Sequence, residues 1–230
     1  IASMTKPVIG VAVMMLVEEG KIHLNDPVSR YIPQFKDMKV AVAQPPLTPG
    51  AGRAGGAGNA APRFYSVPAQ REITTRDLLT HVSGLGSGPM GNSDIEKVAR
   101  KDGETLSDYI PRLGSTSLEF QPGSRWTYSP GAGFDTLARI VEVTSGQPLD
   151  AFLRQRVFEP LGMKDVSFSP PAALEPRLVT AYLLDPGGRA RKDSNPNRMQ
   201  STVYFSGGGG VGGTAEDYAK FAQMLLNGGE

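Results

Sequence analysis

A run of apolar residues near the start of the chain constrains its fold more than any other feature of the sequence. From Val8 to Val17 the residues VIGVAVMMLV carry no charge and place apolar side chains almost all round a helix. This pattern predicts a helix buried inside a domain, because a surface helix keeps one polar face. Gly20 is a residue type that commonly ends a helix. We therefore expect a buried helix over residues 3–19.

The start of this helix carries a Ser-x-x-Lys sequence, Ser3-Met4-Thr5-Lys6, which occurs once in the chain. Residues three apart lie on the same face of a helix, so the Lys6 amine can lie beside the Ser3 hydroxyl and help to remove its proton. Unpaired backbone N–H groups and the positive end of the helix dipole favour an alkoxide or an oxyanion there. The motif predicts a nucleophile that attacks a carbonyl, and a chance match is the alternative.

Composition argues against several classes of function. The chain has 230 residues, of which 39% are hydrophobic and 20% charged, and a formal net charge of +1. This balance indicates neither nucleic acid nor a membrane surface as a partner. The absence of Cys and the presence of only two His argue against a thiolate or histidine-rich metal site. No run reaches the roughly 18 consecutive apolar residues that a membrane span requires.

A second group of candidate residues follows the turn Gln121-Pro122-Gly123, in the sequence Trp126-Thr127-Tyr128-Ser129-Pro130-Gly131. Tyr128 lies in a connection before a helix predicted over 134–145, where functional side chains are often presented. A nearby ammonium favours the phenolate of a tyrosine, which can then take the serine proton or pass it to a leaving group. Aromatic packing is the alternative. We expect His81 to be a hydrogen-bonded structural residue rather than a base.

The rest of the sequence predicts a mainly helical chain with few strands. Further helices are expected over residues 75–81, 93–101, 104–113, 149–158 and 215–226, and short strands over 166–169 and 178–184. Thr75 is a candidate N-cap, and Ser93-Asp94-Ile95-Glu96 has the spacing of a capping box. Residues 41–70, rich in Ala, Gly and Pro, predict a flexible insertion loop. The glycine cluster from Gly207 to Gly213 predicts a tight turn beside a pocket, since no Gly-Lys-Ser/Thr follows it.

Together these motifs resemble the serine β-lactamase superfamily, in particular its class C-like enzymes, its penicillin-binding-protein-like members and the family VIII carboxylesterases. In that family the first motif is Ser-x-x-Lys, matched by Ser3 and Lys6, and the second is Tyr-x-Asn or Tyr-Ser-x, matched at Tyr128 and Ser129. The resemblance covers nearly the whole chain. It implies that Ser3 is the acylated nucleophile and that Lys6 and Tyr128 form the proton-transfer pair. Further stretches that resemble the family are residues 71–81, 158–163 and 207–218.

The resemblance also implies an α/β sandwich, of which residues 1–230 form a partial catalytic domain. They are expected to be mostly its helical part, with most sheet strands missing, and to be a fragment or a processed product. The family's third motif, Lys-Thr-Gly or His-x-Gly on a strand, is expected after the last helix and does not occur before Glu230. Its edge strand normally donates an oxyanion N–H, and losing such a donor costs on the order of a hundredfold or more in rate. We therefore expect residues 1–230 alone to be a poor catalyst.

One departure from the family pattern narrows the expected function. Pro130 stands where penicillin-recognising members usually carry Asn, and proline has no side-chain amide to hydrogen-bond an acylamino substituent. We therefore expect a serine hydrolase that cleaves small carboxylic esters through an acyl-enzyme on Ser3, without a metal or organic cofactor. A β-lactamase or a D-alanyl peptidase or transesterase acting on a lactam or peptide is the alternative. A non-catalytic β-lactamase-like binding module is the second alternative.

Overall fold

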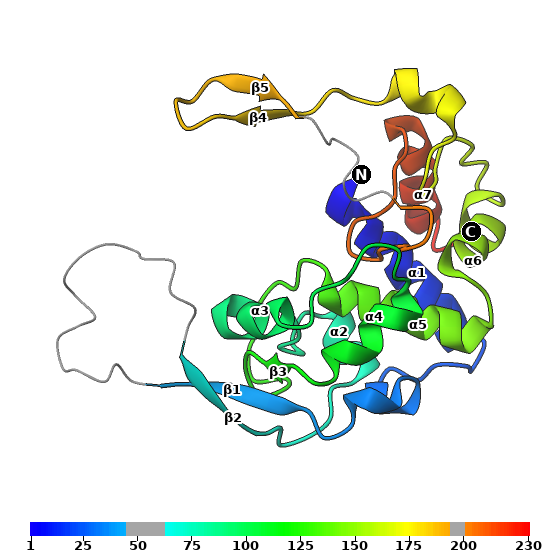
Figure 1. The fold of residues 1–230 in the computed structure, drawn as a ribbon. Helices are drawn as coiled ribbons and strands as arrows, with labels where there is room; N and C mark the ends of the chain where they lie inside the picture. Colours follow the sequence, from blue (N-terminus) through cyan, green and yellow to red (C-terminus); the bar gives the residue numbers. More distant parts are fainter. Residues whose placement is uncertain (45–62, 194–200) are drawn as a thin grey trace.

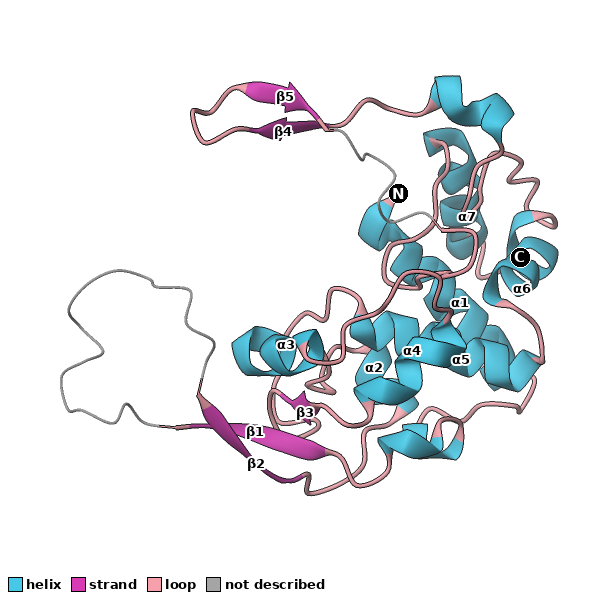
Figure 2. Ribbon diagram, in the orientation of Figure 1, coloured by secondary structure: helices cyan, strands magenta, loops and turns pink. Residues whose placement is uncertain are grey.

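The computed structural model describes residues 1–44, 63–193 and 201–230 as a mixed α/β chain dominated by helices (Figures 1 and 2). The helices are α1 (Thr5–Glu18), α2 (Thr75–Leu79), α3 (Gly88–Glu96), α4 (Leu106–Leu113), α5 (Ala132–Ser145), α6 (Leu149–Leu153) and α7 (Ala215–Leu226). The strands are β1 (Lys39–Ala43), β2 (Phe64–Pro68), β3 (Ser117–Leu118), β4 (Tyr182–Leu184) and β5 (Ala190–Lys192). Within the described residues, no helix is long and apolar enough to cross a membrane.

The core forms where α1 crosses α5 (Figure 1). One face of α1 is fully buried, and α2 and α4 pack against α5 as well. The buried residues of α1 include Val8, Ile9, Ala12, Val13 and Leu16, whose spacing of three to four residues follows one side of the helix. Lys6, in the first turn of α1, therefore lies on a helix whose one face is packed in the core.

The other face of α1 is not buried, so the prediction of a helix enclosed on all sides is wrong. Met14 is 41% exposed. Together with Pro7 and Val11 it lines a groove of about 730 Å³, whose opposite wall includes Met224 and Leu225 from the end of α7. The apolar side chains of α1 therefore pack into the core on one face and line this groove on the other.

The two faces of α1 allow a matched stability test. Leu16→Ala is expected to lower the free energy of unfolding by about 2–5 kcal/mol, because it opens a cavity at a fully buried position. Met14→Ala, on the half-exposed face, is expected to change it by no more than about 0.5 kcal/mol. Urea titrations of the two variants measure the difference. Equal losses would mean that the two faces are packed alike.

The described strands form two small sheets. In the first, of order β2-β1-β3, β1 pairs antiparallel with β2 from Lys39↔Pro68 to Ala43↔Phe64, and parallel with β3. In the second, β4 and β5 form an antiparallel hairpin whose residues are all exposed. This hairpin projects from the helical body in Figure 1.

One loop prediction and two strand predictions differ from the structure. Residues 41–43 and 64–68 belong to β1 and β2, whereas we expected a loop over 41–70; residues 45–62 of that segment lie outside the described residues. The strand expected over 166–169 is reduced to one bridge between Ser167 and Gly212. Of the strand expected over 178–184, only β4 forms. Pairing with another segment decides each case: β1 with β2, Ser167 with Gly212, and β4 with β5 in a hairpin. Local composition does not report this pairing.

Helix boundaries are best predicted where the cap lies in the local sequence. α5 and α7 match their predicted ranges within two residues, and Thr214 caps α7 by accepting from the Asp217 N–H. Thr74, rather than the expected Thr75, caps α2 in a capping box with Asp77. The helix expected over 149–158 divides into α6 and a π turn at Arg154–Phe158.

α3 begins five residues earlier than the sequence predicts. We expected a helix over 93–101 that begins at a Ser93 cap, whereas α3 runs over Gly88–Glu96. The Glu119 carboxylate accepts the Met90 and Gly91 N–H groups at 2.8 and 2.7 Å and so satisfies the first turn from outside the helix. Asp94 is therefore inside the helix, where it accepts the backbone N–H of Ser117.

Candidate active site

Ser3 and Lys6 lie side by side, as their spacing predicts. A 3-10 turn, Ala2–Met4, leads directly into α1 and carries Ser3 at its centre. The Lys6 Nζ donates to the Ser3 Oγ at 3.3 Å. Ser3 is exposed, whereas Lys6 is buried with 5% of its surface accessible. The hydroxyl is thus open to a substrate while the amine beside it is shielded from water.

Two backbone carbonyls complete the environment of the Lys6 amine. Its Nζ donates to the Pro130 carbonyl at 2.7 Å and to the Gly208 carbonyl at 2.6 Å. The Ser3 Oγ is the third acceptor within hydrogen-bond distance of the Nζ. Lys6 therefore joins three segments that are far apart in the sequence: the start of α1, the connection before α5 and the glycine cluster.

The Tyr128 phenol is the closest polar partner of the Ser3 hydroxyl. Its Oη donates to the Ser3 Oγ at 2.7 Å, and the Lys6 Nζ lies 5.0 Å from the centre of its ring. Burial raises the pKa of Tyr128, but hydrogen bonding with Lys6 and Ser3 and the charge of Lys6 outweigh it, so the net pKa is lowered. The phenolate is therefore easier to form here than in water.

His81 supports the connection that carries Tyr128. Its Nδ1 accepts the Ser129 N–H at 3.2 Å, and its ring lies 4.8 Å from the ring of Tyr128 and 5.4 Å from that of Phe134. Burial, together with the charge of Lys6, lowers the pKa of His81. A neutral ring that accepts a backbone hydrogen bond agrees with the prediction that His81 is a structural residue rather than a base.

The two backbone amides that follow Ser3 differ from the expectation. The Met4 N–H donates to the Ile1 carbonyl at 3.1 Å, and the Thr5 N–H donates to the Ala2 carbonyl. Both amides are used inside the 3-10 turn, so the prediction of unpaired N–H groups is wrong for them. The sequence did not indicate that a 3-10 turn, rather than α1 itself, would carry the serine.

Asp135 is a buried group of this region that sequence reasoning missed. It lies in the first turn of α5 and accepts three hydrogen bonds: from the Tyr204 Oη at 2.7 Å, the Ser206 Oγ at 2.7 Å and the Gly208 N–H at 2.8 Å. Burial raises the pKa of Asp135, and these three donors and the charge of Lys6 oppose the increase. An acidic residue in the first turn of a helix is common because the helix dipole favours it there, so the sequence alone did not mark Asp135 as part of this region.

The arrangement of these segments has a counterpart in known proteins. The profile of the family described as Beta-lactamase matches residues 1–230, the whole chain. The chain belongs to the Beta-lactamase family.

Individual relatives in the Beta-lactamase family are moderately similar. The chain is 38% identical to Protein Rv1367c of Mycobacterium tuberculosis (strain ATCC 25618 / H37Rv), covering 100% of this chain and 54% of that protein. It is 31% identical to Esterase EstB of Burkholderia gladioli, covering 98% of this chain and 56% of EstB. The structure of EstCE1, a hydrolase with promiscuous acyltransferase activity, is similar with a TM-score of 0.71 at 26% identity, covering 100% of this chain and 59% of EstCE1. The chain thus spans about half the length of the curated relatives.

The glycine cluster from Gly207 to Gly213, for which we expected a tight turn beside a pocket, lies next to Lys6 of the Ser-x-x-Lys motif. Gly207 and Gly208 pack so closely on the start of α5 that an added Cβ would lie 2.4 Å from the Phe134 carbonyl oxygen and 2.8 Å from the Gly131 Cα, respectively. Only glycine allows this approach. The Gly208 carbonyl can therefore reach Lys6.

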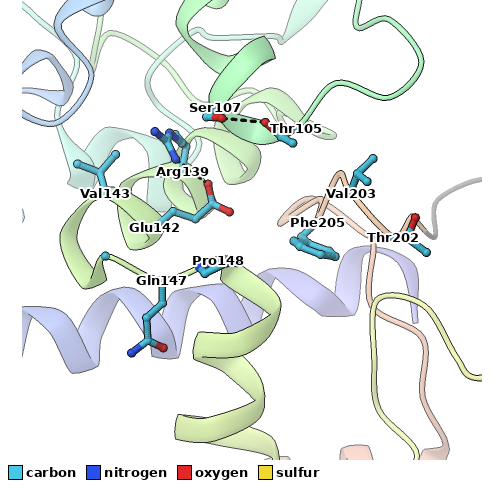
Figure 3. A pocket seen from close by; sticks show the side chains of 11 residues that line it. Thr105, Ser107, Arg139, Glu142, Val143, Gln147, Pro148, Thr202, Val203 and Phe205 are labelled. Carbon is cyan, nitrogen blue, oxygen red and sulfur yellow. Dashed lines mark hydrogen bonds and ion pairs between the residues drawn. The ribbon is translucent and has the colours of Figure 1, made fainter.

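A separate pocket of about 570 Å³ lies along the C-terminal half of α5 (Figure 3). Arg139 and Glu142 form an ion pair at 2.9 Å in its wall, and Val203 and Phe205 face them across the opening. None of Ser3, Lys6 and Tyr128 lines this pocket. The structure thus brings all three predicted residues together elsewhere, at the start of α1.

Proposed function

We propose that the chain carries the nucleophile and the proton-transfer groups of a serine hydrolase that cleaves small carboxylic esters. The observation that supports this most directly is the geometry at Ser3, whose Oγ lies 2.7 Å from the Tyr128 Oη and 3.3 Å from the Lys6 Nζ. A nucleophile within hydrogen-bond reach of a base that a third group orients is the general arrangement for covalent catalysis. Lys6 orients Tyr128 and favours its phenolate.

In the proposed reaction, Ser3 Oγ attacks the ester carbonyl while its proton passes to the Tyr128 phenolate. The Lys6 ammonium stabilises that phenolate before attack and keeps the phenol close to the reacting atoms. Collapse of the tetrahedral intermediate breaks the bond to the alcohol, which takes the proton from Tyr128 as it leaves. Water then attacks the acyl-Ser3 ester and gives a proton to Tyr128, which passes it to the Ser3 Oγ as the bond to the acyl group breaks and the carboxylic acid is released.

Two observations favour an ester over a lactam or a peptide. Pro130 uses its backbone carbonyl to hold Lys6 and has no side-chain amide for an acylamino group. The relative EstB is named as an esterase. A β-lactamase or a D-alanyl peptidase remains the alternative function for the same nucleophile, because an acyl-enzyme on Ser3 serves both chemistries.

The substrate class is tested by comparing p-nitrophenyl butyrate with benzylpenicillin under identical conditions. We expect the ester to be hydrolysed with a burst of p-nitrophenol and the penicillin to leave no covalent adduct in the intact mass. Faster turnover of the penicillin than of the ester would contradict the esterase proposal. Hydrolysis of neither substrate by a folded sample would contradict the catalytic proposal for this chain.

The lowered pKa of Tyr128 predicts a pH dependence. The rate of Ser3 acylation is expected to rise with pH as the phenol deprotonates and to level off below the pH at which an ordinary tyrosine titrates. Tyr128→Phe should lower the rate by about 10²–10⁴-fold and remove this rise, because it deletes the base. Stopped-flow acylation between pH 6 and about 10 measures both curves. An unchanged pH profile in Tyr128→Phe would assign the proton transfer to another group.

A further inference from the structure

Asp135 is a buried carboxylate that the proposed reaction does not use. It is 7% exposed, and its two oxygens accept from Tyr204, Ser206 and Gly208. Burying a carboxylate costs free energy unless hydrogen bonds compensate it, and three donors converge on this one. All three donors belong to residues 204–208, so Asp135 fixes this one segment to the start of α5.

Gly208 connects Asp135 to the lysine beside the nucleophile. Its N–H donates to the Asp135 Oδ1 at 2.8 Å, and its carbonyl accepts from the Lys6 Nζ at 2.6 Å. In Figure 1 the orange loop that precedes α7 lies beside the blue start of α1. The N–H of Gly208 is therefore bonded to a side chain of α5, and its carbonyl is bonded to the Lys6 amine.

Close packing and hydrogen bonding have different effects on this glycine. A Cβ on Gly208 would lie 2.8 Å from the Gly131 Cα and 3.0 Å from the Pro130 oxygen, so packing sets how near the loop approaches α5. Packing of a residue without a side chain does not set the direction of its carbonyl. A hydrogen bond is directional, and the bond from the Gly208 N–H to Asp135 fixes the peptide plane that precedes the Gly208 Cα, which leaves fewer orientations to the following carbonyl that holds Lys6.

We propose that Asp135 is a positioning residue of this site: it orients the Gly208 carbonyl, and through it holds the Lys6 amine beside Ser3. The catalytic consequence rests on the proposed function, whereas the placement of Lys6 does not. A displacement of about 1 Å in a catalytic group costs on the order of a hundredfold in rate. Loss of the Asp135 contact is therefore expected to slow acylation while leaving substrate binding unchanged.

Four variants test this role. Asp135→Ala removes the acceptor, and Asp135→Asn retains an oxygen that can still accept from Gly208. Asp135→Leu combined with Tyr204→Phe and Ser206→Ala replaces the buried polar cluster with apolar groups, which keeps a folded comparison if the alanine variant does not fold. Tyr204→Phe alone is the matched control, because it removes one donor and leaves the bond between Asp135 and Gly208 in place.

Two readouts separate the placement of Lys6 from the activity of the site. The first is the rate of Lys6 acetylation by acetic anhydride, followed by peptide mass mapping, which reports how well the amine is held and buried. The second is the reaction of Ser3 with a fluorophosphonate, resolved into a maximal rate and a half-saturating concentration. We expect the alanine and triple variants to raise Lys6 acetylation several-fold. We also expect them to lower the maximal Ser3 rate by on the order of tenfold to a hundredfold at an unchanged half-saturating concentration.

The asparagine variant and the Tyr204→Phe control are expected to behave as the unmodified chain in both readouts. Unchanged Lys6 acetylation in a folded alanine or triple variant would overturn the proposal. So would an asparagine variant that behaves as badly as alanine. If the unmodified chain does not react at Ser3, the proposed function fails, and the Lys6 readout alone then decides the role of Asp135.

Discussion

Replacing Ser3 with alanine is expected to abolish ester hydrolysis above the background of the buffer. The reason is that the proposed reaction passes through an ester of the Ser3 Oγ, which alanine cannot form. Ser3 is exposed and lies before α1, so the variant should keep the thermal stability of the parent chain. Release of p-nitrophenol from p-nitrophenyl butyrate measures the loss.

Ser107→Ala is the matched control for this experiment. Ser107 is an exposed serine whose hydroxyl contacts Thr105, and it has no contact with Ser3, Lys6 or Tyr128. Its variant should hydrolyse the ester at the rate of the unmodified chain. Retention of activity in Ser3→Ala would show that another group performs the attack and that Ser3 is not the nucleophile.

Lys6→Met is expected to lower the rate of Ser3 acylation by about 10²–10⁴-fold, because it removes the charge that favours the Tyr128 phenolate. The change also leaves the Pro130 and Gly208 carbonyls without their donor, and the loss at the buried Gly208 carbonyl costs about 1–3 kcal/mol. We therefore expect a less stable protein as well. Fluorophosphonate labelling and urea titration measure the two effects separately.

Lys220→Met provides a control of the same type of change. The Lys220 ammonium donates to the Gly162 carbonyl and pairs with Asp217, so this lysine also holds a backbone carbonyl. Because Lys220 is on α7 and contacts none of the site residues, its variant should label at the normal rate. A comparable loss of labelling in both lysine variants would indicate that lowered stability, rather than the missing charge, explains Lys6→Met.

The structure brings the three predicted site residues together, and the sequence indicated this proximity in two different ways. Ser3 and Lys6 lie within one turn of chain, and a fixed spacing brings them together in any helix-like segment. Tyr128 lies 125 residues away from Ser3, and only its position in a connection before a helix, together with the family resemblance, points to it.

The supporting residues of the site could not be found in this way. Asp135 looks like an ordinary acidic residue in the first turn of a helix, and its partners Tyr204 and Gly208 lie about 70 residues further along the chain. The carbonyl groups of Pro130 and Gly208 carry no sequence signal at all, because every residue has one. Contacts of this kind depend on the packing of segments and become visible only in the structure.

The difference between local signals and distant contacts also explains which helices and strands were predictable. α5 and α7 follow from apolar periodicity and from local capping residues, so their boundaries were predictable. The start of α3 depends on Glu119, which caps it from a distant segment, and β1 depends on partners in β2 and β3. Where an element depends on a partner far along the chain, the local sequence does not predict its boundaries.

Whether Ser3 is an activated nucleophile is tested most directly by the intact mass of the chain after reaction with a fluorophosphonate. We predict a single adduct, which peptide mapping places on Ser3 and which is absent from Ser3→Ala. An adduct on a different serine, or no adduct on a folded sample under conditions that label a control serine hydrolase, would contradict the claim.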